Sequence, residues 1–116
     1  MDKKPNRYYS KIQENSVAKA LGGKTQPNSG ARTFAKGDCV TDCFAIECKT
    51  STTNKKSVAI KKEWLTKIEH EAFSIGKSDF ALAFNFGPKQ PNYYIISEDT
   101  FKRLNEFISE VEWNLY

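Results

Sequence analysis

Asp38, Glu47 and Lys49, near the middle of the chain, are residue types that can bind a metal ion and assist hydrolysis. Glu47 and Lys49 stand two residues apart in the apolar run Phe44–Lys49, so in a strand both side chains would point to one face. Charges on an otherwise apolar strand are costly to desolvate, so this pair does little for folding. Mg²⁺, by contrast, needs only one or two carboxylates, and it activates water and stabilises charge on a phosphoryl group. The three residues therefore favour a metal-dependent phosphodiesterase site.

Each of these residues has an expected role in that chemistry. Asp38 and Glu47 would converge across a hairpin to hold the metal, with the backbone carbonyl of Cys48 as a further ligand. Lys49 would orient the attacking water or stabilise charge in the transition state. Asp42 also precedes Glu47, but it falls in the expected turn, so Asp38 is the preferred ligand and Asp42 the alternative. A slip of one residue in the hairpin register would exchange the two faces of the strand.

An acid on the first helix offers a further carboxylate. Ser10 is expected to cap a helix that runs to about Leu21 and ends at Gly22 and Gly23. Glu14 shares the face of the apolar residues that follow it at helical spacing. Two interpretations of Glu14 remain open: a carboxylate at the edge of that face that reaches water, or a third carboxylate directed at the site.

The N-terminal half of the chain is strongly basic and contains the proposed site. Residues 1–62 carry 13 Lys and Arg against 5 Asp and Glu, whereas residues 63–116 carry 5 against 9. That asymmetry is typical of a protein that binds a phosphate backbone, although a solvated lysine-rich surface has the same composition. Residues 1–9 are expected to form a flexible basic arm, and residues 22–36 a loop. The side chains expected to hold the phosphates of DNA are Ser29, Arg32, Lys36, Lys55, Lys56, Lys61 and Lys62.

The remaining periodicity predicts one α/β domain that spans residues 1–116. A second helix is expected from Lys61 to about Ile75, and a third after a cap at Ser97 or Asp99. The expected order of elements is α-β-β-β-α-β-β-α, which corresponds to a mixed sheet flanked by helices. The five expected strands are Asp38–Val40, Phe44–Lys49, Ser57–Ile60, Phe80–Phe86 and Tyr93–Ile96.

Composition disfavours several other classes of protein. No apolar run of the 116 residues approaches the length of a membrane span and no apolar leader occurs, so a soluble cytoplasmic protein without a membrane partner is expected. Three cysteines, Cys39, Cys43 and Cys48, lie within ten residues, but no CxxC occurs and His70 is the only histidine. A zinc site is therefore disfavoured, and reduced buried thiols are expected. A single histidine leaves no Ser-His-Asp or Cys-His constellation, and the chain has no GxxxxGK phosphate loop.

Asp38, followed nine residues later by Glu47-Cys48-Lys49, resembles the core motif of the PD-(D/E)xK nuclease superfamily. The motif lies at the end of an apolar strand, after a helix that carries a glutamate and before an amphipathic helix and strand. One position departs from the pattern, because Gly37 stands where the superfamily has a proline. The resemblance covers roughly residues 7–86.

Within that superfamily, the Glu14 helix and the Ser29-Gly30-Ala31 segment resemble the small Holliday junction resolvases of archaea and phages. The resemblance implies a restriction-endonuclease-like core with an extra C-terminal strand and helix. It also implies a metal site of Glu14, Asp38 and Glu47 that takes Mg²⁺ or Mn²⁺. A homodimer that cuts two strands of a four-way DNA junction, inside a prokaryotic or phage-infected cell, would follow. Two other functions stay open: a nuclease of the same fold acting on linear duplex, flaps or single strands, and a nucleic-acid-binding module without catalysis.

Overall fold

The computed structural model describes residues 6–26 and 37–114 as three helices and five strands. Within these residues the strands form one mixed sheet in the order β1-β2-β3-β4-β5. The prediction of an α/β fold with a mixed sheet and flanking helices is therefore confirmed. The elements are α1 (Asn6–Leu21), β1 (Lys24–Thr25), β2 (Cys39–Val40), β3 (Phe44–Lys49), α2 (Lys62–Ser74), β4 (Asp79–Phe84), β5 (Tyr93–Ile95) and α3 (Glu98–Asn114).

The central strand of the sheet, β3, carries the Glu47 and Lys49 pair. It pairs antiparallel with β2 and parallel with β4, whereas β1 and β5 pair antiparallel at the two edges. Parallel strands need a crossover, and α2 supplies it between β3 and β4. The carboxyl ends of β3 and β4 therefore lie at the same end of the sheet, where Lys49 is found.

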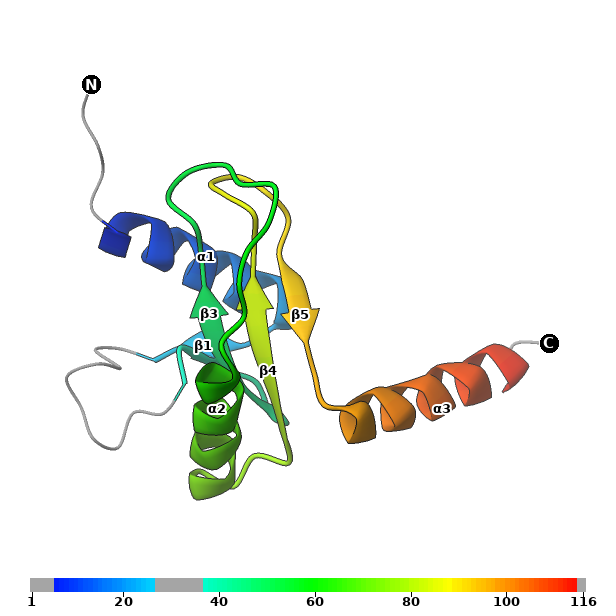
Figure 1. Cartoon of the computed structure of the whole chain (residues 1–116). Helices are drawn as coiled ribbons and strands as arrows, with labels where there is room; N and C mark the ends of the chain where they lie inside the picture. Colours follow the sequence, from blue (N-terminus) through cyan, green and yellow to red (C-terminus); the bar gives the residue numbers. More distant parts are fainter. Residues whose placement is uncertain (1–5, 27–36, 115–116) are drawn as a thin grey trace.

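The two faces of β3 pack against different helices, as the alternation of its residues predicts (Figure 1). On one face Ile46 packs with Val17 of α1, and on the other Ala45 packs with Ile68 and Ala72 of α2. All five side chains are nearly or completely buried. The sheet is thus enclosed between two helices, and the polar end of β3 lies at the margin of this core.

Four details of the predicted elements are wrong. The helix α1 begins at Asn6, so residues 6–9 are helical and not part of an arm. Ser10 is not its cap, because the Ser10 hydroxyl donates to the Asn6 carbonyl within the helix. Residues 57–60 form no strand: both sides of β3 are already paired, and the segment leads into α2 instead. Three strands do precede α2, but the one that was not predicted is β1 at Lys24–Thr25. It has only two residues, which is too short to show a periodicity in the sequence.

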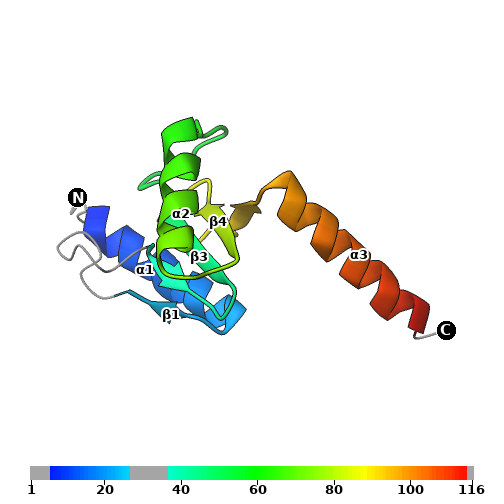
Figure 2. The same cartoon turned by 90° about the horizontal axis from the view of Figure 1, so that it is seen from below.

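The last helix, α3, projects from the body formed by the sheet, α1 and α2 (Figures 1 and 2). Its cap is Ser97, whose hydroxyl oxygen accepts a hydrogen bond from the backbone N–H of Thr100 at 3.1 Å. This confirms one of the two caps expected from the sequence. Among the residues that the structure describes, no helix is both long enough and apolar enough to cross a bilayer.

Candidate active site

Asp38 lies immediately before β2, beside the end of β3 that carries Glu47. The strands pair Cys39 with Ile46 and Val40 with Ala45. The N–H of Asp38 donates at 2.9 Å to the carbonyl of Ile46, the residue before Glu47, so the regular register of the pair ends at Cys39. The Asp38 carboxylate is close enough to Glu47 to raise the pKa of that side chain. The hairpin therefore brings two carboxylates that are nine residues apart in the sequence into one electrostatic cluster.

Asp42, the alternative ligand, lies elsewhere. It lies in the exposed turn between β2 and β3, before the first residue of β3, whereas Glu47 and Lys49 lie near the last. The backbone carbonyl of Asp42 accepts a hydrogen bond from Nζ of Lys77. The turn is held by the hydroxyl of Thr41, which accepts from the N–H of Phe44 at 2.9 Å. This local bond fixes the turn in which Asp42 is exposed. The choice of Asp38 and not Asp42 as the metal ligand stays a prediction.

The Asp38 carboxylate is held in place by the backbone of β3. Its Oδ2 accepts a hydrogen bond from the N–H of Cys48 at 2.8 Å. The N–H and C=O of one strand residue point to the same side, as the exchanged bonds of an antiparallel pair show. The Cys48 carbonyl, expected from sequence to be a metal ligand, therefore points to the side on which Asp38 lies.

Glu47 is a buried acid with an unfavourable charge environment. It is only 7% exposed, and its Oε2 lies 3.5 Å from Nζ of Lys49. Burial raises the pKa of Glu47, and the Asp38 carboxylate raises it further, whereas Lys67 and Lys49 lower it. The net effect is a raised pKa, so the surroundings of Glu47 disfavour its negative charge even with Lys49 beside it.

Glu14 joins the same electrostatic cluster from α1. Burial raises the pKa of Glu14 to about 7, with further contributions from the Asp38 and Glu47 carboxylates. These interactions favour the second interpretation of Glu14, a third carboxylate near the site, over a glutamate that merely reaches water. Asp38 and Glu47 thus act on Glu14, and Asp38 acts on Glu47, so carboxylates from α1, the residue before β2 and β3 make a region of concentrated negative potential.

The donors in this region suit a hard divalent cation. Mg²⁺ takes carboxylate and carbonyl oxygens, and Glu14, Asp38, Glu47 and the Cys48 carbonyl are all oxygen donors. In the part of the chain that the structure describes, no three His, Cys, Asp or Glu side chains stand at the spacing of a ready metal site. Rotation of the carboxylates would be needed to bring their oxygens onto one ion.

Lys49 is positioned by two contacts that the sequence did not reveal. Its Nζ lies 4.6 Å from the centre of the Trp64 ring on α2, a cation–π distance. Its backbone carbonyl accepts a hydrogen bond at 2.9 Å from the amide of Gln13, which precedes Glu14 on α1. Neither contact was predicted, because each joins parts of the chain that lie far apart in the sequence.

A polar contact from α2 supports the loop before Asp38. The N–H of Gly37 donates to Oε2 of Glu71 at 3.0 Å, and Lys67 lies 3.8 Å from the same carboxylate. Gly37 has φ +77°, which a residue with a side chain rarely adopts. This conformation gives a physical reason for glycine immediately before Asp38.

An open cavity of ≈ 310 Å³ adjoins the site and is lined by Lys49, Lys55, Lys61 and Trp64. Lys55 and Lys61 are exposed and come from the loop between β3 and α2. Lys56 and Lys62 are also exposed on this segment but do not line the cavity. Of the expected phosphate-binding residues, the structure thus brings two beside Lys49. The other expected contacts, Ser29, Arg32 and Lys36, lie outside the described residues.

The cysteines and the histidine lie at different depths in the structure. His70 is exposed on α2. Cys39 is buried and Cys48 is half-buried, whereas Cys43 is exposed in the hairpin turn, so the expectation of buried thiols is wrong for Cys43.

Three comparisons with known proteins complete the description of the site. No protein-family model, curated protein or solved structure matches the chain. Any functional conclusion therefore depends on the residues and geometry described above.

Proposed function

We propose that this chain is a Mg²⁺-dependent DNA endonuclease of the PD-(D/E)xK type that resolves four-way junctions. The observation that carries the proposal is the Asp38 carboxylate bonded to the N–H of Cys48, beside the ion pair of Glu47 and Lys49 that flanks Cys48 on β3. Two carboxylates and a lysine in this neighbourhood support the assignment of the sequence motif.

The order of the elements adds support. The motif strand β3 follows a glutamate-bearing helix and a hairpin partner, and it precedes a crossover helix and a parallel strand. The order α-β-β-β-α-β is the one that the resemblance to a restriction-endonuclease-like core implies, although its third strand is β1, before β2, and not residues 57–60. The strand β5 and helix α3 are additions at the C-terminal side.

In the proposed mechanism, Asp38, Glu47 and the Cys48 carbonyl would hold the metal, with Glu14 as the further carboxylate. When bound there, Mg²⁺ would supply an activated water and stabilisation of charge on the phosphoryl oxygens. Lys49 would place a positive charge beside these oxygens or orient the water, and its contact with Trp64 limits the positions of its ammonium group. Glu14, whose pKa is raised to about 7, would have to be deprotonated to act as a ligand.

The basic side of the site supports a nucleic acid as substrate. Lys55 and Lys61 line the same cavity as Lys49, so a phosphodiester that lies in it meets three ammonium groups. Lys56 and Lys62 extend this positive surface. The choice of a four-way junction over other DNA follows from the resemblance to junction resolvases.

Cleavage of an end-labelled four-way junction in Mg²⁺ tests the proposal. Lys49→Ala should lower the cleavage rate by about 10²–10³-fold, the size expected when a group that stabilises transition-state charge is lost. Lys77→Ala is the matched control, because Lys77 precedes β4 at the opposite end of the sheet. Full activity of Lys49→Ala would overturn the site assignment.

The two rival functions give different results in the same assay. Equal cleavage of the junction and of linear duplex with the same arms would indicate a nuclease of broader substrate range. Salt-sensitive junction binding without cleavage in Mg²⁺ or Mn²⁺ would indicate a binding module.

A further inference from the structure

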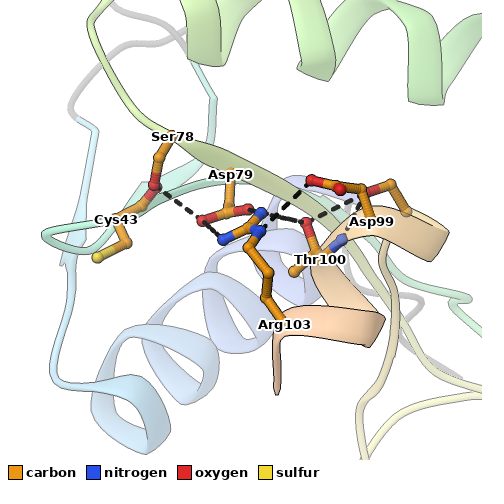
Figure 3. Close-up of polar contacts among 7 residues, drawn as sticks. Cys43, Ser78, Asp79, Asp99, Thr100 and Arg103 are labelled. Carbon is orange, nitrogen blue, oxygen red and sulfur yellow. Dashed lines mark hydrogen bonds and ion pairs between the residues drawn. The ribbon is translucent and has the colours of Figure 1, made fainter. Parts of the chain in front are cut away.

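One buried polar atom stands out among the residues that the structure describes. Gln13 on α1 is 3% exposed, and its Oε1 is the one buried side-chain oxygen or nitrogen in this part of the chain that has no hydrogen-bond partner. Asp79 shows the usual situation, because its buried carboxylate accepts a hydrogen bond from Thr100 at 2.8 Å and forms an ion pair with Arg103 (Figure 3). An unpaired buried acceptor is destabilising, so Oε1 of Gln13 indicates a place where a ligand would donate a hydrogen bond.

The orientation of the Gln13 amide is set by its surroundings. Its Nε2 donates to the backbone carbonyl of Lys49 at 2.9 Å, and Oδ1 of Asn92 lies 3.3 Å away. Exchange of the nitrogen and the oxygen would turn an acceptor toward these acceptors. Asn92 is fixed in turn, because its Nδ2 donates to the Ser16 hydroxyl at 3.3 Å. Oε1 therefore remains an acceptor for a donor from outside the fold.

Gln13 lines a cavity of ≈ 340 Å³ at the carboxyl ends of β3 and β4. The floor contains Thr50 and Asn85, the residues that directly follow these two strands. One wall is the first half of α1, and the other is the loop between β4 and β5, which lies beside the loop after β3 (Figure 1). The volume is near the lower end of the about 300–1,000 Å³ of small-molecule sites, so it suits a single small ring system.

The α1 wall of the cavity is aromatic and apolar. Tyr8, Tyr9 and Ile12 line it, and the two tyrosine rings meet edge to face with their centroids 5.2 Å apart. Tyr9 and Gln13 are four residues apart, as are Tyr8 and Ile12, so these side chains share one side of the helix. A flat ligand would stack on this wall, with its edge toward the Gln13 amide.

The rest of the lining is polar and nearly uncharged. Asn85, Gln90 and Asn92 bring three further amides, each with a donor and an acceptor side by side. The described residues that line the cavity include no acid and one cation, Lys89. Amides at an aromatic wall suit a neutral, planar ring with several hydrogen-bonding groups, which is the chemistry of a nucleobase. Every DNA base has an N–H on its pairing edge that would donate to Oε1 of Gln13.

This cavity adjoins the basic cavity of the candidate active site. Thr50 and Asn85 line both cavities, and the Thr50 hydroxyl donates to Oδ1 of Asn85 at 2.9 Å. Lys49 lines the basic cavity, and its backbone carbonyl accepts the hydrogen bond from Gln13. A base in the first cavity and a phosphate in the second would thus belong to the same stretch of one DNA strand.

We propose that the cavity beside Gln13 receives one unpaired base of the DNA strand whose phosphates lie at Lys49. The base stacks on the tyrosine wall, and its pairing edge donates to Oε1 of Gln13. A base inside a duplex uses that edge for its partner, so the cavity selects DNA in which a base leaves the stack at little cost, as at a branch point or in a single strand. The position of the strand, but not the base specificity of the cavity, rests on the proposed nuclease function.

Binding of two single strands with the same number of phosphates tests the cavity. One strand carries thymine on every sugar, and the other is abasic throughout, so the electrostatic attraction is matched. Fluorescence anisotropy in Ca²⁺ gives the affinities, with gels to confirm intact strands. We expect the thymine strand to bind about 5–150-fold more tightly, the range for stacking of one base. Equal affinities, or no binding of either strand, would overturn the proposal.

A matched pair of variants locates the base. Tyr8→Leu should remove most of the preference for the thymine strand, because leucine keeps apolar volume without a ring that stacks. Tyr93→Leu should leave the preference unchanged: Tyr93 is 50% exposed, against 47% for Tyr8, but does not line the cavity. Equal losses in the two variants would place the base on another surface and reject the cavity.

A base analogue tests the hydrogen bond to Gln13. Difluorotoluene has the shape of thymine but no N–H, so a strand that carries it should bind about fivefold or more weakly than the thymine strand. Equal affinities for these two strands would overturn the proposal, since Oε1 would then receive no donor from the base.

The outcome for the cavity can be separated from the outcome for the nuclease. A chain that cleaves junctions in Mg²⁺ but does not distinguish thymine from abasic strands would keep the proposed function and lose the base site. A chain that prefers the thymine strand but cleaves no DNA would keep the base site and lose the proposed function.

Discussion

The N–H of Cys48 donates a 2.8 Å hydrogen bond to the carboxylate of Asp38, which ties the end of the hairpin to the strand that carries Glu47 and Lys49. This bond joins the backbone of one expected metal ligand to the side chain of another. It restricts the position of the Asp38 carboxylate. The geometry leads to five predictions.

Asp38→Asn should abolish Mg²⁺ binding and junction cleavage, whereas Asp42→Asn should leave both unchanged. The first change removes a charge next to Glu47, and the second alters an exposed turn. Isothermal titration with Mg²⁺ and the cleavage assay measure the two effects. The assignment of Asp38 would be wrong if the two variants lost activity to the same extent.

Trp64→Leu should lower the cleavage rate more than it lowers affinity for DNA. The ring keeps the Lys49 ammonium group within 4.6 Å, and leucine retains apolar volume without the cation–π attraction. Loss of about 0.5–2 kcal/mol of that attraction corresponds to a 2–30-fold change. Single-turnover kinetics separate cleavage from binding, with Trp64→Phe expected to restore most of the rate. An unchanged cleavage rate in Trp64→Leu would show that Lys49 needs no such support.

Gln13→Leu should destabilise the protein by about 1–3 kcal/mol, because the carbonyls of Lys49 and Ala83 both lose the amide that donates to them. Gln13 is 3% exposed, so water cannot readily replace that amide. Urea denaturation measures the loss. Gln90→Leu, in the loop between β4 and β5, is the exposed control and should change stability by less than about 0.5 kcal/mol.

Without a divalent cation, stability should fall as the pH rises from about 4.5 to 7. The folded state holds the Glu14 proton up to a pKa of about 7, against an ordinary value of 4.5, so the unfolded state releases it first. Burial also raises the pKa of Glu47, which acts in the same direction. Urea midpoints at pH 5 and pH 8 give the slope, and Glu14→Gln should make it shallower. An unchanged slope in that variant would place Glu14 in solvent.

The attachment of α3 should have the opposite pH dependence. The hydrogen bonds of Arg103 lower the pKa of Asp79 below its ordinary value of 3.8, so the stabilisation is complete above that value. It is lost as the pH falls through the lower folded pKa. Asp79→Asn should lose about 1.5–3 kcal/mol at pH 7, the range for hydrogen bonds to charged groups, and should remove this acid dependence. Asp42→Asn, an exposed acid, is the control.

Local patterns determined much of the fold and of the central motif. The alternation in Phe44–Lys49 separates the two packed faces because a strand has a period of two. The helical spacing of Ile68 and Ala72 placed α2 correctly for a similar reason. The placement of Asp38 beside the end of β3 that carries Glu47 followed from a short turn, whose geometry depends on neighbouring residues only.

Contacts between distant residues decided the rest. Gln13 reaches Lys49 across 36 residues, and Asp79 fixes Arg103 across 24. No periodicity in the sequence indicates such pairs, because these contacts form only when the helices pack on the sheet. The sequence predicted a strand at residues 57–60, but β2 and β4 occupy both sides of β3. Sequence alone thus determined which side chains share a face. The tertiary structure decided which faces meet, since hydrogen-bond partners and buried area are shared among segments far apart in the chain.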